Sequence, residues 1–243
     1  MQKYKLAPAP SSEVEKNLLN YSPLLRQLLV GRGIVSAELA EAFLKPHYEN
    51  HSHDPFLMKD MEKAVERILR AVQNDEHIAI FSDYDADGIP GAVVLHDFFK
   101  RIGHLNFENY IPDRHGEGFG LNNSAIKQFN NSGCKLVITI DCGITDAEEV
   151  AYANELGLDV IITDHHLPNG NGLPAAYAIL NPKQSDCTYP ERMLCGSGVV
   201  FKLVQGLLAE IRRQPTTYNI QLTTGWEKWL LDMVGLATLS DMV

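Results

Sequence analysis

The sequence lacks the features that would place a protein in or across a membrane. No apolar run approaches the roughly 18 residues that a membrane-spanning helix requires. Residues 1–12 are polar and contain proline, without the apolar centre of a signal peptide. We therefore expect a cytoplasmic protein that has no membrane partner.

Cysteine is also scarce, and its placement fits no zinc pattern. The four cysteines are Cys134, Cys142, Cys187 and Cys195. A chain of 243 residues can build a sufficient core without disulfide bonds. The cysteines are thus expected to be reduced thiols, which agrees with a cytoplasmic location.

Basic residues are outnumbered, because 21 Lys and Arg stand against 31 Asp and Glu and give a net charge of −10. Taken alone, this charge argues against nucleic-acid binding, since contacts to phosphate need Lys and Arg. Clustered carboxylates that hold cations produce the same excess. The net charge therefore decides nothing, and a nucleic-acid surface would have to be a local basic patch.

Short apolar runs alternate with segments of helical periodicity along most of the chain. Such runs, bounded by polar residues, predict buried strands, while helical spacing recurs around 60–72, 91–99, 123–131, 146–156 and 199–212 and from 226 onward. This alternation predicts an α/β fold, with a mostly parallel sheet covered by helices on both faces. The predicted strands are Ile78–Phe81, Phe107–Ile111, Leu136–Ile140, Val160–Thr163 and Ala178–Leu180.

The first part of the chain, residues 1–50, is expected to be a short helical N-terminal extension of a domain over residues 51–243. Ser22 and Ser36 each precede apolar residues at helical spacing, as helix caps do. Residues 47–58 are rich in His, Asn and Asp and predict a connector, and residues 215–224 predict another connection.

Ligand-type residues follow three of the predicted strands. The carboxyl ends of parallel strands line one crevice, so these side chains should meet there and repel one another unless cations hold them. Carboxylates with one or two imidazoles suit Mn²⁺ or Mg²⁺, and this many of them suggest two ions about 3.5–4 Å apart. The residues are Asp83, Asp85, Asp87, Asp141, Asp164, His165 and His166.

Two other loop types do not fit the segment after the first strand. Asp83, Asp85, Asp87 and Gly88 match the start of an EF-hand, but the twelfth position is Val94 instead of Glu and the preceding segment is a strand. No Gly-Lys-Ser/Thr follows, so a P-loop is excluded. Gly88 and Gly91 are expected to supply backbone freedom in a tight turn.

These clusters resemble the motifs of the DHH phosphoesterase superfamily, with Leu239–Val243 similar to its fourth motif. Within the superfamily the chain is most similar to the RecJ family of single-stranded-DNA-specific exonucleases, from about Tyr21 to Val243. The similar segments are Asp54–Leu57, Asp83–Gly88, Ile111–Leu121, Asn181–Gln184 and Gly196–Val199.

The resemblance implies roles for individual residues. The implied metal ligands, for two Mn²⁺ or Mg²⁺ ions, are Asp85, Asp87, Asp141, His165 and Asp241, with Asp83 either a ligand or a partner of one. Asp141 would bridge both ions, Asp164 would orient a histidine, and His166 would face the substrate phosphate, which makes these three the catalytic set. Arg114 would clamp a phosphate, and His115 and Glu117 are weaker candidates.

The chain departs from the family pattern in places. Pro90 and Gly91 stand where a hydroxyl residue followed by a small one is common, and Ser240 stands where Ala is common. By the resemblance, the second catalytic lobe and the OB-fold of the family would follow Val243, and we expect neither within this chain. We therefore expect residues 51–243 to be the DHH catalytic domain of an N-terminal portion of a longer protein, or of a degenerate relative.

The resemblance implies an exonuclease that hydrolyses single-stranded DNA from the 5′ end by two-metal activation of water. Single-stranded DNA is the expected partner, together with repair or replication proteins, and the oligomeric state stays open. This chain alone is expected to bind DNA weakly. The alternatives are a DHH phosphodiesterase for short oligonucleotides or cyclic dinucleotides, and a non-catalytic relative associated with replication.

Overall fold

The computed structural model describes residues 9, 11–170, 172–218, 220 and 222–243. It divides into one unit that ends at His53 and a second, larger unit, Asp54–Val243. Most of residues 1–12, for which we predicted no signal peptide, lie outside the described residues. In the described part, no helix is both long and apolar enough to cross a bilayer.

The N-terminal unit is helical. It contains α1 (Ser12–Asn17), α2 (Pro23–Val30), α3 (Ala37–Leu44) and the single turn α4 (Tyr48–His51). As predicted, the hydroxyls of Ser22 and Ser36 cap α2 and α3 by accepting backbone N–H groups. Leu18, Leu29 and Ala40 form its small core. The segment 47–58 is more ordered than a plain connector, because it contains α4 and the 3₁₀ turn η1 (Pro55–Leu57).

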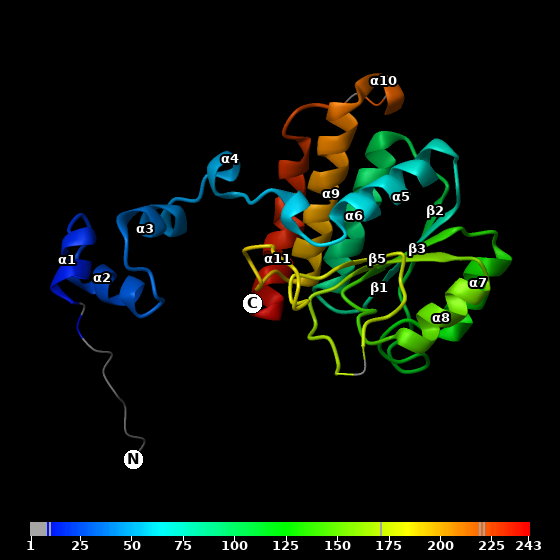
Figure 1. The fold of residues 1–243 in the computed structure, drawn as a ribbon, viewed down its shortest axis with the longest axis horizontal. Helices are drawn as coiled ribbons and strands as arrows, with labels where there is room; N and C mark the ends of the chain where they lie inside the picture. The colour runs from blue at the N-terminus through cyan, green and yellow to red at the C-terminus, as the bar shows by residue number, and fades with distance from the viewer. Residues whose placement is uncertain (1–8, 10, 171, 219, 221) are drawn as a thin grey trace, which may run out of the picture. The chain divides into compact units, whose positions relative to one another are not determined.

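The larger unit is built on a five-stranded sheet (Figure 1) in which every neighbouring pair is parallel. The strand order is β2-β1-β3-β4-β5. This confirms the predicted fold class. Each strand lies within a residue of its predicted bounds. The prediction of a buried strand is wrong for β2, which includes Glu108 and Asn109 and is only partly buried at the edge of the sheet. The strands are β1 (Ile78–Ser82), β2 (Phe107–Tyr110), β3 (Leu136–Ile140), β4 (Asp159–Thr163) and β5 (Ala178–Leu180).

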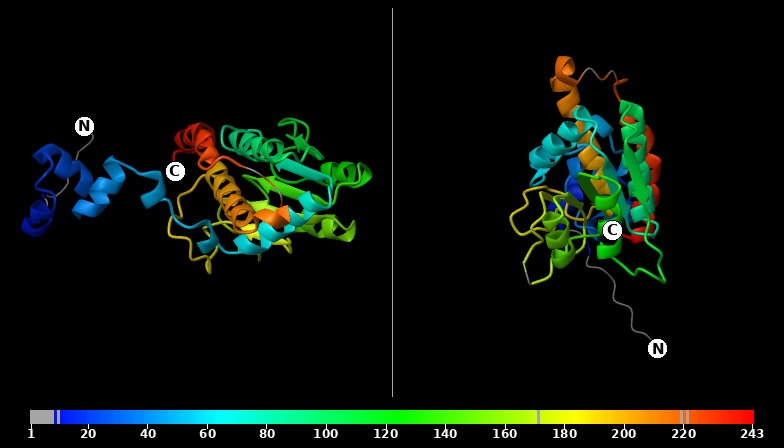
Figure 2. Two further views of the ribbon diagram at one scale, coloured as in Figure 1. Left: turned by 90° about the horizontal axis from the view of Figure 1, so that it is seen from above. Right: turned by 90° about the vertical axis from the view of Figure 1, so that its right-hand side faces the viewer.

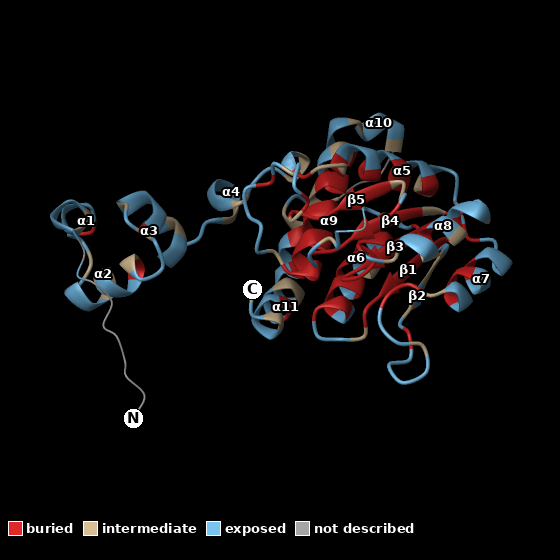
Figure 3. Ribbon diagram, turned by 60° about the horizontal axis from the view of Figure 1, so that its bottom comes forward, coloured by how far each residue is buried: buried red, intermediate tan, exposed pale blue. Residues whose placement is uncertain are grey.

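Helices cover both faces of the sheet, and successive strand residues alternate between them. On one face, α7 (Asn123–Asn131) and α8 (Ala147–Glu155) bury a cluster that includes Phe81, Val137 and Ile162. On the other face, α5 (Met61–Gln73), α6 (Gly88–Ile102) and α9 (Gly196–Arg213) contact the strands. Figure 2 shows these layers, and Figure 3 shows that the central strands are buried, whereas the edge strand β2 is only partly buried.

The C-terminal helices pack beside α9. The short α10 (Pro215–Tyr218) lies within the predicted connection, which is therefore partly helical. The predicted last helix begins as a 3₁₀ turn, η2 (Trp226–Leu230), and continues as α11 (Leu231–Asp241), which contacts α6 and α9. This packing brings the end of the described chain to the carboxyl end of the sheet.

The helix after β1 begins at Gly88, three residues before its predicted start. Neither Gly88 nor Gly91 has a positive φ, so the predicted role in backbone freedom is wrong. Close approach explains both glycines. A Cβ on Gly88 would lie 2.5 Å from the carbonyl oxygen of Asp83, and one on Gly91 would lie 2.7 Å from Ile140 Cγ2.

Candidate metal centre

Three aspartates stand in a row at the carboxyl edge of the sheet, because the strand register continues for one residue past the strands. The backbone N–H of Asp83 donates to the carbonyl of Ile140, that of Asp141 to Thr163, and that of Asp164 to Leu180, at 2.8–3.1 Å. The sheet therefore presents residues that are far apart in the sequence side by side, as the carboxyl ends of parallel strands do.

Asp141 lies at the centre of this row and is held in an unusual conformation. Its φ of 61° is left-handed, which a non-glycine residue adopts at a cost of about 1–3 kcal/mol. Burial, followed by the charges of Asp87 and Asp85, raises the pKa of its carboxyl group to about 9. Its Oδ1 is buried without a hydrogen-bond partner in the described structure. An anion in this position calls for a cation.

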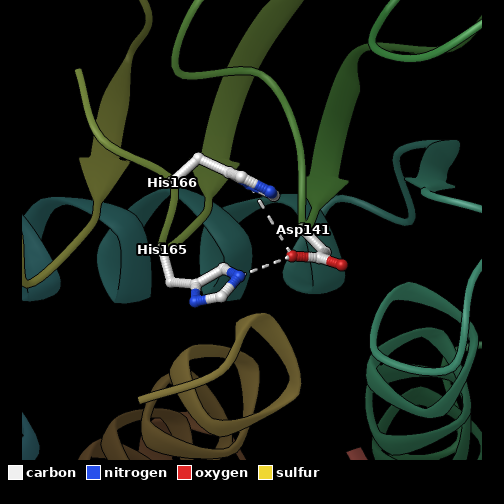
Figure 4. A group of neighbouring side chains, drawn as sticks. All are labelled: Asp141, His165 and His166. Atoms are coloured by element: carbon white, nitrogen blue, oxygen red, sulfur yellow. Dashed lines mark ion pairs between the residues drawn. The ribbon is translucent and has the colours of Figure 1, made fainter. Parts of the chain in front are cut away.

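His165 faces carboxylates from three parts of the fold. Its Nε2 lies 3.3 Å from Asp141 Oδ1, 3.7 Å from Asp87 Oδ2 and 3.6 Å from Asp241 Oδ2. The last of these comes from the end of α11, so this helix completes the group. The ring of His165 and that of His166 both point to the same carboxylate oxygen of Asp141 (Figure 4).

Asp164 orients a histidine, and that histidine is His166. Asp164 Oδ1 accepts the Nδ1–H of His166 at 2.8 Å, along with the backbone N–H groups of His165 and His166. Burial opposes ionisation of Asp164, but these hydrogen bonds outweigh it and lower the pKa of the carboxyl group. The hydrogen bond to Asp164 raises the pKa of His166. Asn181, which had no role assigned from its sequence position, donates to the carbonyl of His166 at 2.9 Å.

Asp87 joins the start of α6 to the start of α9. Its carboxylate accepts the backbone N–H groups of Gly196 and Ser197 at 2.6 and 2.7 Å, and Ser197 Oγ donates to its carbonyl at 2.6 Å. The dipole of α9 favours a negative charge at this end. Gly196 is required here, because a Cβ on it would lie 2.7 Å from the Asp141 carboxylate. The resemblance marked the segment Gly196–Val199 but assigned it no role.

Asp83 and Asp85 lie on the other side of Asp141. Asp85 Oδ1 accepts the backbone N–H groups of Asp87 and Gly88, which ties the loop to the first turn of α6. Burial raises the pKa of Asp83, whose Oδ1 is buried without a hydrogen-bond partner in the described structure. One oxygen of each carboxylate thus remains for a ligand.

These residues fit a metal site by their chemistry. Asp83, Asp85 and Asp141 bring one carboxylate oxygen each to within 4.8 Å of one another. Asp87, His165 and Asp241 form a second group under the same limit, and Asp141, His165 and His166 form a third. The first two groups share no residue, which is the arrangement that two ion positions need. Buried ligand atoms without partners, Asp141 Oδ1 and Asp83 Oδ1 among them, match cation ligands.

The loop after β2 carries the other predicted residues. The guanidinium of Arg114 lies over the ring of Tyr84, 5.2 Å from its centre, and its charge favours the ionised form of Asp83. His115 is exposed, and its backbone N–H donates to Asp113. Glu117 accepts the Tyr110 hydroxyl and the backbone N–H of Asp113, so its contacts hold the loop together.

The sequence and the fold are similar to those of known proteins. Residues 77–238 match the DHH family, N-terminal domain. The chain is 42% identical over 238 residues to the single-stranded-DNA-specific exonuclease RecJ of Bacillus subtilis (strain 168), covering 96% of this chain and 28% of the relative. It is 36% identical over 223 residues to RecJ of Escherichia coli (strain K12), covering 91% and 37%. The chain thus spans well under half of these curated relatives.

Solved structures of the same kind share the fold. RecJ from Thermus thermophilus in complex with Mn²⁺ matches with a TM-score of 0.72 at 25% identity, over 94% of this chain and 30% of that chain. An exonuclease RecJ bound to manganese matches with a TM-score of 0.64 at 28% identity, over 76% and 43% of the two chains.

Proposed function

The chain belongs to the DHH family, and from this premise we propose that it is a metal-dependent phosphodiesterase that hydrolyses single-stranded DNA as an exonuclease. The family resemblance drawn from the sequence is thereby confirmed. Similarity to RecJ relatives over nearly the whole chain supports single-stranded DNA as the substrate, and attack from the 5′ end is the direction that the family resemblance implies.

The observation that carries the proposal is the acidic row with its buried, unpartnered oxygens. Asp141 belongs to the first group of candidate ligands, and its Oδ1 lies 3.3 Å from His165 Nε2 of the second group, which suits a bridging ligand of two Mn²⁺ or Mg²⁺ ions. Asp85, Asp87, His165 and Asp241 complete the proposed ligand set, and Asp83 joins through its free oxygen. Bound there, the ions would polarise phosphoryl oxygens and lower the pKa of a water molecule.

His166 is proposed to contact the substrate phosphate. Its Nδ1–H is held by Asp164, so Nε2 is the nitrogen left for a substrate oxygen. The side chain is 46% exposed, in contrast to the buried His165. A donor fixed in this way stabilises negative charge that develops on phosphate oxygens, because it needs no reorganisation during the reaction.

Arg114 is proposed to bind a second phosphate of the strand. It is exposed on the loop after β2, and its stacking over Tyr84 limits the orientations of the guanidinium. A planar guanidinium binds phosphate through paired N–H donors. We also propose repair or replication proteins as partners and a cytoplasmic location, as the resemblance to the RecJ family implies.

The test compares three 3′-labelled substrates in Mn²⁺: a single strand, its duplex and a dinucleotide. We expect the single strand to be shortened in preference to the duplex. His166→Ala should lower the rate by at least about a hundredfold while leaving Mn²⁺ binding intact. Leu105→Ala is the control, since Leu105 is exposed near the amino end of β2.

Two results would overturn the proposal. Preferential cleavage of the dinucleotide would assign the site to short oligonucleotides. Equal rates for His166→Ala and the unaltered chain would remove His166 from the substrate site.

A further inference from the structure

Phe119 is an exposed aromatic residue at the edge of the metal centre that no step above has used. Its ring lies 5.7 Å from that of His166, edge to face at 73°. His166 Nδ1 in turn lies 3.9 Å from Asp141 Oδ1. One side chain therefore separates the Phe119 ring from the central carboxylate. Phe119 is 53% exposed, although phenylalanine gains free energy from burial.

Exposure alone would mean little, because many apolar residues of this chain are exposed. The loop around Phe119, residues 111–122, is anchored on both sides of the ring. On one side, Glu117 accepts the Tyr110 hydroxyl, the backbone N–H of Asp113 and the side-chain amide of Asn122. On the other side, Asp146 Oδ2 accepts the backbone N–H of Leu121 at 2.7 Å.

Glycine residues flank Phe119 on both sides and allow the backbone conformation of its loop. Gly118 and Gly120 have φ values of +83° and +85°, a left-handed backbone conformation that residues other than glycine rarely adopt. A Cβ on Gly120 would also lie 2.8 Å from Asp146 Oδ2. Gly118 and Gly120 thus permit the backbone conformation in which the Phe119 ring lies beside His166 and remains exposed to solvent.

An aromatic ring next to a phosphate site offers one kind of contact to a nucleic acid. Every nucleobase has a π-face, and stacking on aromatic side chains is the common way to hold single strands without reading their sequence. The same loop carries Arg114, five residues earlier, for which we proposed a phosphate contact. The loop therefore combines a guanidinium for the backbone with an apolar ring for a base.

We infer that Phe119 is a specificity-determining residue that stacks on an unpaired nucleobase next to the scissile phosphate. This inference rests on the proposed function and names the contact by which the site selects single strands. A base within a duplex is stacked on both faces and is not available to the ring. A single strand presents its terminal base freely, so the platform favours it without any contact to base edges.

The experiment pairs a change in the protein with a change in the substrate. The substrates are one single-stranded oligonucleotide and two copies of it that carry an abasic residue, at the terminal or at the second position. The proteins are the 243-residue chain and the variants Phe119→Ala, Phe119→Trp and Leu105→Ala. For each pair, kcat and KM are measured in Mn²⁺.

We expect Phe119→Ala to lower kcat/KM on the normal strand by about tenfold, mostly through KM, as loss of one stacked base does. On one of the two abasic strands, Phe119→Ala and the unaltered chain should be equal, because the stacking partner is already gone. Phe119→Trp should restore the normal value, and Leu105→Ala should match the unaltered chain. Equal losses on all three strands would show that Phe119 merely supports His166, and would overturn the inference.

A binding measurement separates this inference from the proposed function. Phosphorothioate copies of the oligonucleotides resist hydrolysis, and their binding can be followed by fluorescence anisotropy. Hydrolysis without any effect of Phe119→Ala overturns the stacking contact and leaves the exonuclease proposal standing. Binding that depends on Phe119, in a chain that does not hydrolyse the strand, overturns the exonuclease proposal and leaves the stacking contact standing. If neither hydrolysis nor binding is observed, both proposals are overturned.

Discussion

Charged side chains are buried at both ends of the sheet, but the two ends differ in how these charges are paired. At the amino end, Arg67 of α5 is buried and forms ion pairs with Glu76 at 2.8 Å and Asp159 at 2.5 Å. At the carboxyl end, the ion-pair partners of Asp87, Asp141 and Asp241 within the described residues are histidines. The amino end supplies its own cation, while the carboxyl end has an excess of negative charge.

This difference distinguishes a structural cluster from a binding site. A buried charge is costly unless it is paired, so an end that pairs its charges contributes to the stability of the fold. An end whose carboxylates have only histidines as ion-pair partners, and whose Asp141 Oδ1 has no hydrogen-bond partner in the described structure, is suited to an external cation. Four experiments test this contrast, in order of decreasing effect.

The largest effect is expected at the amino end. Arg67→Ala should lower the free energy of unfolding by about 3 kcal/mol or more, because it leaves the partly buried Glu76 and Asp159 without a cation. Arg70→Ala, an exposed position on the same helix, should change it by only about 0.5 kcal/mol. Urea unfolding measures both. If the two variants are equally stable, the amino-end cluster is not structural.

At the carboxyl end, stability should depend on the metal instead. Mn²⁺ at a hundred times its dissociation constant should stabilise the unaltered chain by about 2.7 kcal/mol. Asp141→Ala should abolish that gain while changing the stability of the metal-free protein much less, since the buried carboxylate oxygen Oδ1 has no hydrogen-bond partner to lose. Thermal unfolding with Mn²⁺ and with a chelator measures both quantities. A Mn²⁺ shift that survives in Asp141→Ala would remove this residue from the ligand set.

A smaller loss of Mn²⁺ affinity is expected when the Asp141 carboxylate is displaced instead of removed. Gly196→Ala places a Cβ 2.7 Å from the Asp141 carboxylate and should weaken Mn²⁺ binding by about ten- to a hundredfold. Gly198→Ala is the matched control in the same helical turn, because its Cβ meets its nearest neighbour, Leu194, at 3.4 Å. Calorimetric titration compares the two. Equal affinities would show that the close approach of Gly196 does not set the position of Asp141.

The smallest effect concerns pH in the metal-free protein. Burial raises the pKa of Asp141 from 3.8 to about 9, so the folded chain keeps a proton that the unfolded chain has released between these values. The free energy of unfolding should therefore fall as the pH rises through this window. Asp141→Asn should flatten the profile by on the order of 1 kcal/mol in chelator. Parallel profiles for the two proteins would contradict the effect of burial.

Much of the fold could be predicted, because the patterns that indicate strands and helix caps involve residues close together in the sequence. Most of the strands are apolar runs of a few residues, and Ser22 and Ser36 cap helices through contacts three residues away. The predicted start of α6 is wrong because Gly88 and Gly91 are typical of turns. In the structure, the missing side chains of these glycines leave room for the close approach of Asp83 and Ile140. Such packing depends on the folded path of the chain, so no local pattern reports it.

In the candidate site, too, local features could be predicted from the sequence, whereas contacts between distant residues could not. The acids and histidines after three strands were identified from their positions, and the family resemblance added Asp241. Their partners could not be predicted, since the cap that Asp87 provides for α9 joins residues about 110 apart in the chain. The same is true of Phe119, whose neighbour His166 follows another strand.

The sequence by itself determined which residues form strands and that ligand-type side chains follow three of them, because both are set by hydrophobic pattern along a few residues. Only the tertiary structure decided that β1, β3 and β4 are adjacent, so that Asp83, Asp141 and Asp164 stand in one row. It also decided that Asp141 meets histidines at one end of the sheet while Arg67 meets carboxylates at the other. The physical reason is that pairing and burial of charge depend on groups brought together by folding, and not on their order in the chain.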